Sequence, residues 1–169
     1  MGYGFDLAEV AFLRSAEGRV ALELADKLPL SVGTRLADVA AVRAIAGGRG
    51  AAVVETALLR RRAATKLEHA ADWLFTDDAL QQATPTAVAA YRAQRLAGRD
   101  VHDVTCSIGA ELSALAPVVR RLLGSDLDPV RLAMAAHNVP HVTLARADAL
   151  APVTRGTVVV ADPGRRAGG

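Results

Sequence analysis

Small and acidic residues in the second half of the chain offer the first place for chemistry. Residues 103–109 read DVTCSIG, an apolar run that ends in small side chains before a helical pattern begins. Such a turn lets a ligand approach the backbone, and the free N–H groups of the helix start can bind it. Gly109 can adopt a positive φ angle. With one glycine the turn departs from the G-x-G-x-x-G dinucleotide fingerprint, and an ordinary strand-to-helix turn is an equally good interpretation.

A second acidic group follows at residues 124–129, which read GSDLDP. Asp126 closes a predicted strand about twenty residues after the first turn, where a carboxylate accepts the hydroxyls of a ribose in open α/β sheets. Asp128 immediately precedes Pro129, and proline is favoured at the first position of a helix. We therefore assign Asp126 to a ligand and Asp128 to a helix cap.

Two further acids follow the later strands. Asp148, between two alanines, can accept a hydrogen bond from an exocyclic amine such as that of adenine, although taken alone an ordinary loop acid explains it better. Asp162 begins the sequence DPGRR directly after a valine-rich strand. All four groups thus stand at the carboxyl ends of predicted strands, which is the edge where open parallel sheets bind ligands.

The elements that must position these groups alternate between strand and helix from residue 98 onward. The predicted strands lie near residues 101–106, 123–127, 142–145 and 157–161, and the predicted helices near 110–122 and 129–138. This alternation is typical of β-α-β units and a parallel sheet. The sequence therefore predicts an α/β fold whose sheet is a partial Rossmann-like one of about four strands.

The first half of the chain has apolar residues three and four positions apart, which is typical of helices. We predict a break at Gly18, a helix capped by Thr76, and one long helix over residues 51–72. The basic run at residues 60–62 is predicted to form a solvated face rather than an RNA contact. The organisation that we predict is a helical domain over residues 1–97 followed by the sheet domain over residues 98–169.

Composition narrows the class of protein. The chain has 169 residues, of which 51% are hydrophobic and 22% charged, so it is not disordered. Its net charge of +2 is too small to indicate nucleic-acid binding, and its 4% aromatic content argues against a base-stacking platform. One cysteine and four histidines without ligand spacing predict neither a disulfide nor a metal site. No signal peptide or membrane span is visible, so we expect a cytoplasmic protein.

Residues 101–169 resemble the first half of a class I S-adenosylmethionine-dependent methyltransferase. DVTCSIGAE is similar to motif I of that family, with Asp103 and Gly109 matching, and Cys106 fits the D-x-x-C-G-x-G form found in RNA methyltransferases. GSDLDPVRLAMAAHN resembles motif II, ADAL motif III, and ADPGRR takes the place of motif IV.

A narrower resemblance covers more of the chain. The stretch WLFTDDALQQATPTAVAAYRAQRLAG and the final D-P-x-R-R-x-G-G are similar to bacterial methyltransferase-like proteins with a THUMP-like domain. Those proteins are relatives of the trimethylguanosine synthase type of RNA guanine-N2 methyltransferase. The resemblance implies methyl transfer from S-adenosylmethionine, with a nitrogen of RNA as the acceptor. A module that binds the cofactor or RNA without catalysis is the alternative.

The resemblance also implies roles for individual residues. The residues expected to hold the cofactor are Asp103, Cys106, Ser107, Gly109, Asp126, Leu127 and Asp148. Asp162 and Pro163 are expected to act in catalysis. Arg165 and Arg166 are expected to contact the substrate.

Three departures from the family pattern carry expectations of their own. Ser107 stands where a glycine is common, which lowers the expected affinity for the cofactor. Pro163 is followed by Gly164 rather than by an aromatic residue. A class I sheet has more strands than the four predicted here, so the sequence reads as a fragment. Its fourth strand is then expected to form an edge that self-association or a partner chain covers.

Overall fold

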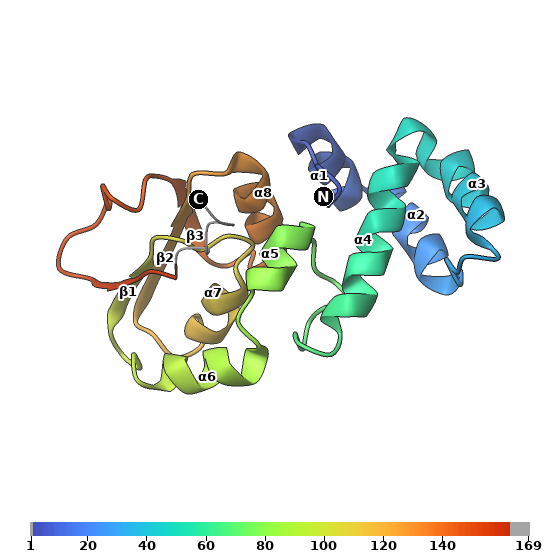
Figure 1. Cartoon of the computed structure of the whole chain (residues 1–169). Helices are drawn as coiled ribbons and strands as arrows, with labels where there is room; N and C mark the ends of the chain where they lie inside the picture. Colours follow the sequence, from blue (N-terminus) through green and yellow to red (C-terminus); the bar gives the residue numbers. More distant parts are fainter. Residues whose placement is uncertain (1, 163–169) are drawn as a thin grey trace, which may run out of the picture.

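The computed structural model describes residues 2–162 and begins with a group of helices. These are α1 (Leu7–Arg14), α2 (Ala16–Lys27), α3 (Arg35–Ala46), a short 3-10 turn (Gly47–Arg49), α4 (Gly50–Ala63), α5 (Asp77–Gln82) and α6 (Thr86–Gln94). In Figure 1, α2, α3 and α4 lie at one end of the molecule, and α5 lies between them and the sheet.

The remaining elements alternate strand and helix as predicted. They are β1 (Asp100–Asp103), α7 (Ala110–Leu115), β2 (Arg121–Asp126), α8 (Pro129–Asn138), β3 (Thr143–Arg146) and β4 (Val158–Val160). The four strands are parallel and lie in the order β3-β2-β1-β4. This is the start of the Rossmann order, so the predicted α/β fold with a partial four-stranded sheet is confirmed.

Local capping signals account for the helix starts that the sequence predicted. Asp6 and Glu9 form a capping box, and the Thr76 side chain accepts from the Ala79 N–H at 3.1 Å. The Asp128 carboxylate accepts from the N–H groups of Val130 and Arg131, so α8 begins at the predicted proline. Each of these starts depends on neighbours in sequence alone.

Three predicted helix boundaries were wrong. The break between the first two helices is at Ser15, which ends α1 and caps α2. Gly18 lies inside α2, where a Cβ atom would come within 1.9 Å of the Phe12 carbonyl oxygen. The long helix ends at Ala63, and turns occupy most of the way to residue 72. Helix α7 ends at Leu115 because Pro117 disfavours helical backbone in the residue before it.

The basic run on α4 is also not the solvated face that was predicted. Arg60 donates to the carbonyl oxygens of Trp73 and Asp72. Arg61 donates to four carbonyl oxygens at the C-terminal end of α2, among them that of Pro29 at 2.8 Å. These two guanidinium groups therefore close gaps in the backbone hydrogen bonding of the protein itself.

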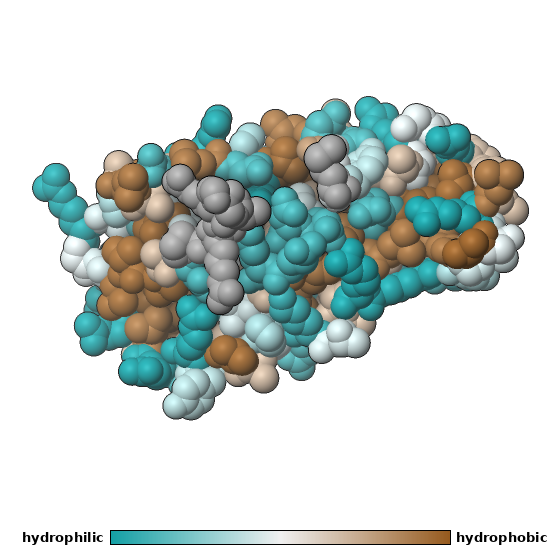
Figure 2. All heavy atoms as spheres, in the orientation of Figure 1, coloured by the Kyte–Doolittle hydropathy of each residue, from teal (hydrophilic) through white to brown (hydrophobic). Residues whose placement is uncertain are grey.

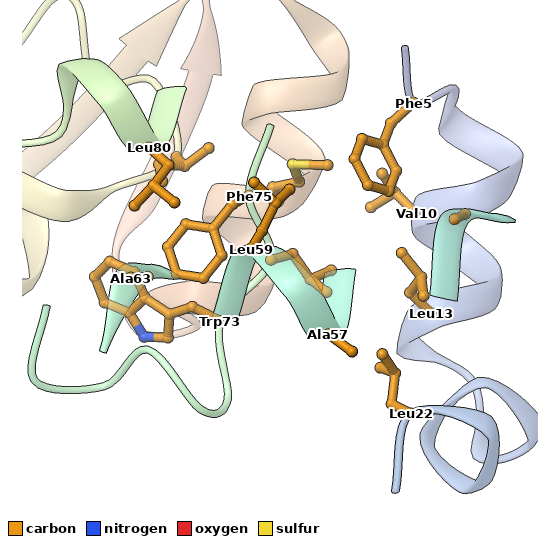
Figure 3. Packing of buried hydrophobic residues seen from close by; sticks show 14 of the residues in the cluster. Phe5, Val10, Leu13, Leu22, Ala57, Leu59, Ala63, Trp73, Phe75 and Leu80 are labelled. Carbon is orange, nitrogen blue, oxygen red and sulfur yellow. The ribbon is translucent and has the colours of Figure 1, made fainter. Parts of the chain in front are cut away.

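One hydrophobic cluster runs from the helices into the sheet half. It includes Leu59, Phe75 and Leu80, which Figure 3 shows gathered around α4 and α5, and it continues to Ile108 and Met134. On the surface of the view in Figure 2, apolar and hydrophilic residues are interspersed over both halves. The domain boundary near residue 97 stays a prediction.

Asn138 ties the two halves by hydrogen bonds. Its amide oxygen accepts from the Leu74 N–H at 2.8 Å, and its amide nitrogen donates to the carbonyl oxygens of Leu74 and Ile108 at 3.0 and 2.9 Å. All three partners are buried. Asn138 thus fixes the turn after β1 against the segment that precedes α5.

We expect Asn138→Ala to lower the free energy of unfolding by about 2–3 kcal/mol, because it leaves buried backbone groups without partners. Urea denaturation measures this change. Gln94→Ala, at an exposed position, is the control and should leave stability within experimental error. An Asn138→Ala variant as stable as the control would show that these bonds do not join the halves.

Strand β4 is an edge of the sheet, as predicted. Val158 and Val160 are half-buried against the side that carries α6 and α7, whereas Val159 is 49% exposed. The connection from β3 crosses the other side, where Thr154 bonds to His102 of β1 at 2.9 Å. Among residues 2–162, no helix combines the length and apolarity needed to cross a bilayer.

Candidate functional site

A cavity of about 260 Å³ lies at the carboxyl ends of β1, β2 and β4. Its walls come from the turn after β1, from Asp126 at the end of β2, from the end of β4, and from the connection between α5 and α6. The chain leaves β1 toward β2 on one side, and β4 pairs with β1 on the other. The cavity therefore occupies the point where the strand order reverses, which is where sheets of this kind bind ligands.

The turn after β1 is held by hydrogen bonds to both neighbouring strands. The Val104 N–H donates to the carbonyl oxygen of Val160, and the Cys106 N–H to that of Ser125, each at 2.9 Å. Gly109 has a φ of 89°, as the sequence predicted, and a Cβ there would lie 2.9 Å from a Val139 methyl group. The turn is thus rigid and passes close to α8.

Ser107 is the strained residue of this turn. Its φ of 49° lies in the left-handed region, which side chains other than glycine rarely adopt. Its Oγ is buried and has no hydrogen-bond partner among the residues that the structure describes. Its N–H donates to the Asp126 carboxylate at 3.0 Å. The residue that replaces the expected glycine therefore keeps the backbone conformation of a glycine.

We expect Ser107→Gly to raise the free energy of unfolding by about 1 kcal/mol, because it removes left-handed strain and an unpaired buried hydroxyl. Ser107→Ala is the matched variant, since it removes the hydroxyl and keeps the strain, and it should gain less. Thermal unfolding compares the two. A loss of stability in Ser107→Gly would mean that the hydroxyl is not idle.

The two acids after β2 divide their work as the sequence predicted. Asp128 caps α8. Asp126 lines the cavity, and its two carboxylate oxygens accept from the N–H groups of Ser107 and Asp128 at 3.0 and 2.9 Å. A carboxylate has about four lone-pair sites, so Asp126 can hold the turn and still accept from a ligand.

Asp103 is the buried acid of the site. Only 3% of it is exposed, and its carboxylate accepts from the Thr105 N–H at 3.0 Å. Burial, with smaller contributions from the charges of Glu111, Asp126 and Asp162, raises the pKa of Asp103 to about 7. Near neutral pH this group is thus close to half protonated.

Cys106 lies in the same turn and is a packing residue rather than a nucleophile. Its side chain is buried, and burial together with the charges of Asp103 and Asp126 raises the pKa of its thiol above the ordinary value. Nucleophilic cysteines have a lowered pKa. Cys106 contributes to the wall of the cavity.

Other predicted site residues lie away from the cavity or outside the described structure. Leu127 is 57% exposed and does not line the cavity. Asp148 is exposed and accepts from the Leu150 N–H at 2.9 Å, as an ordinary loop acid does. Asp162 does line the cavity, and its N–H donates to the Thr105 hydroxyl at 2.8 Å. Pro163, Arg165 and Arg166 fall outside the described residues.

Sequence reasoning missed the wall that the helical half contributes. Gln82 and Thr84, between α5 and α6, line the cavity beside Glu111 of α7. Arg92 of α6 bridges Glu111 and Asp162, with N–O distances of 3.4 and 3.7 Å. Burial raises the pKa of Glu111. No local pattern marks these residues, because they meet only through the packing of α6 on α7.

The lining carries more negative than positive groups. Asp103, Glu111, Asp126 and Asp162 contribute carboxylates, and only Arg131 adds a cation directly to the wall. Within residues 2–162, no group of three or more histidine, cysteine and acidic side chains can hold a metal ion. The site thus suits a ligand with hydroxyl groups and positive charge.

Comparison with known proteins relates both halves of the chain to other sequences. A family model described as "Domain of unknown function (DUF8688)" matches residues 6–63, from just before α1 to the end of α4. Two curated relatives are uncharacterized S-adenosylmethionine-dependent methyltransferases of Mycobacterium tuberculosis strains CDC 1551 / Oshkosh and ATCC 25618 / H37Rv. Each is 57% identical over 138 residues, which cover 76% of this chain and 38% of the relative. The chain thus spans well under half the length of these relatives.

A solved structure is similar in fold. It is the crystal structure of a candidate methyltransferase from Porphyromonas gingivalis W83, with a TM-score of 0.55 and 17% sequence identity. The match covers 94% of this chain and 36% of that one. At this identity the likeness shows the fold alone.

Proposed function

We propose that the chain acts in methyl transfer from S-adenosylmethionine to a nitrogen of RNA, within the group of methyltransferase-like proteins that carry a THUMP-like domain. The observation that carries the cofactor assignment is the acidic cavity at the strand-order reversal, with Asp126 at the end of β2. The two mycobacterial relatives, which are named for the same cofactor, support it. The cavity-lining Asp162, whose position suits an acceptor amine, supports the nitrogen assignment.

The residues of the cavity fit this cofactor at its ribose and methionine ends. Asp126 has lone pairs left for ribose hydroxyls, and Asp103 and Glu111 supply negative charge for the cationic part. The unpaired Ser107 Oγ offers a hydrogen bond at the turn. The adenine end has less support, because Asp148 lies outside the cavity lining.

The reaction requires little proton chemistry from the protein. When bound, S-adenosylmethionine supplies a methyl group that its sulfonium already makes electrophilic. The chain therefore has to align donor and acceptor. Asp162 accepts a hydrogen bond from the acceptor amine, and Arg92 holds that carboxylate beside the cavity.

We expect Asp162→Ala to lower kcat for RNA methylation at least tenfold, because a hydrogen bond to a charged group contributes about 1.5–3 kcal/mol. Binding of S-adenosylmethionine should be unchanged. The assay follows labelled methyl groups into purified RNA and identifies the methylated nucleoside after digestion. Wild-type protein that binds the cofactor and leaves RNA unlabelled would favour a non-catalytic module.

The exposed edge strand supports one more proposal about partners. Val159 and the outer backbone groups of β4 offer an unpaired ladder. A second copy of the chain, or a strand of another protein, would pair with it. Sedimentation of the purified chain over a range of concentrations tests self-association.

A further inference from the structure

A cluster of arginines occupies the edge of the sheet opposite the cavity. Arg120 and Arg121 both pair with Asp100 at the start of β1, and Arg99 precedes that residue directly. Arg155, from the connection between β3 and β4, lines a cavity with Arg121 and Asp100. We name these four residues, Arg99, Arg120, Arg121 and Arg155, the arginine cluster.

The cluster holds more positive charge than its acid can neutralise. Asp100 is the only acid that lines the two cavities at this edge, and four guanidinium groups surround it. Among the described residues, neither Arg99 nor Arg155 takes part in an ion pair, and both are exposed. This differs from Arg60 and Arg61, whose donors are used on backbone carbonyls.

Two members of the cluster are fixed in place. The Arg120 Nε and Nη2 atoms each donate to Asp100 at 2.7 Å, and Arg121 donates to the same carboxylate. Asp100 is 7% exposed, whereas Arg120 and Arg121 are 68% and 77% exposed. Arginine has five N–H donors, so the buried carboxylate orients both side chains and leaves other donors pointing to solvent.

The shape of the edge suits an anion chain rather than a single anion. A cavity of about 390 Å³ between Arg99 and Arg120 and one of about 550 Å³ between Arg121 and Arg155 lie on either side of Asp100. Thr157 lines both. Guanidinium groups match phosphate geometry, and evenly spaced phosphates can occupy neighbouring cavities.

We propose that the arginine cluster binds the phosphate backbone of single-stranded RNA. The inference deepens the proposed function, because it rests on RNA being the acceptor and names where its backbone is held. Strand β1 has four residues, so the cluster and the methyl-transfer cavity lie about 10 Å apart along the strand. RNA with one base at the cavity reaches the cluster along the β4 edge with its neighbouring phosphates.

The test measures binding of a short labelled single-stranded RNA by fluorescence anisotropy between about 50 and 200 mM salt. Arg99→Glu/Arg155→Glu removes the two cluster members that make no ion pair with Asp100. Arg19→Glu/Arg35→Glu changes the net charge equally at exposed positions on α2 and α3. We expect the cluster variant to lose at least tenfold in affinity and about 0.7 per lost phosphate contact in salt slope. The control should lose less than threefold.

Three results would overturn the inference. Equal losses in the two variants would assign RNA binding to overall charge. Displacement of RNA by polyglutamate at equal charge concentration would make the cluster a site for acidic polymers in general. Wild-type protein that binds S-adenosylmethionine but not RNA would overturn the cluster and leave the cofactor assignment standing. RNA binding through the cluster without methyl transfer would support the cluster and contradict the catalytic proposal.

Discussion

Asp126→Ala is expected to weaken binding of S-adenosylmethionine at least tenfold, and Asp128→Ala is expected to leave it within a factor of two. Hydrogen bonds to a carboxylate contribute about 1.5–3 kcal/mol each. Asp126 faces the cavity and also accepts from the Ser107 N–H, so its loss removes a ligand contact and loosens the turn beneath the ligand. Calorimetric titration measures both affinities.

The Asp128 variant serves as the control for this result. Its side chain caps α8, so its loss should lower the free energy of unfolding by about 1 kcal/mol. Thermal unfolding of both variants separates a loss of folding from a loss of binding. Equal losses of affinity in the two variants would show that the wrong acid was assigned to the ribose.

Asp103→Asn is expected to raise the free energy of unfolding at pH 8 by up to about 4 kcal/mol and to flatten its dependence on pH. Burial raises the pKa of Asp103 from 3.8 to about 7 in the folded protein. The folded state therefore binds the proton more tightly than the unfolded state does. Stability from this group is complete below about pH 4 and is lost as the pH rises to about 7. A difference of about three pKa units corresponds to roughly 4 kcal/mol.

Asparagine suits this test because its amide oxygen can still accept from the Thr105 N–H. Urea denaturation at several values between pH 4 and pH 8 follows the effect. The same change should weaken cofactor binding, since it removes a negative charge from the cavity. A wild-type protein whose stability does not fall over this range would mean that Asp103 is not buried as a charge.

The parts of the fold that the sequence predicted depend on local signals. Helix α8 begins after Asp128 and ends at Asn138, as expected, because a cap and a proline fix its start. The left-handed Gly109 and the assignment of Asp128 to the cap follow from the same kind of reasoning. The edge position of β4 follows from the strand order alone.

What the sequence did not reveal depends on tertiary packing. Arg92 reaches Glu111 and Asp162 only because α6 packs on α7, and these residues lie in halves that the sequence pattern separates. Asp148 follows its strand as predicted but bonds to its own turn and leaves the cavity. The early end of α7 did have a local signal, Pro117, which the apolar periodicity obscured.

The most direct test of the central claim is calorimetric titration of the purified chain with S-adenosylmethionine. We predict one saturable site whose affinity falls at least tenfold in Asp126→Ala and is unchanged in Asp162→Ala and in Arg99→Glu/Arg155→Glu. Circular dichroism on the same samples establishes that each protein is folded. Absence of binding heat across temperatures from folded wild-type protein, or binding that is indifferent to Asp126, would contradict the assignment of the cavity to this cofactor.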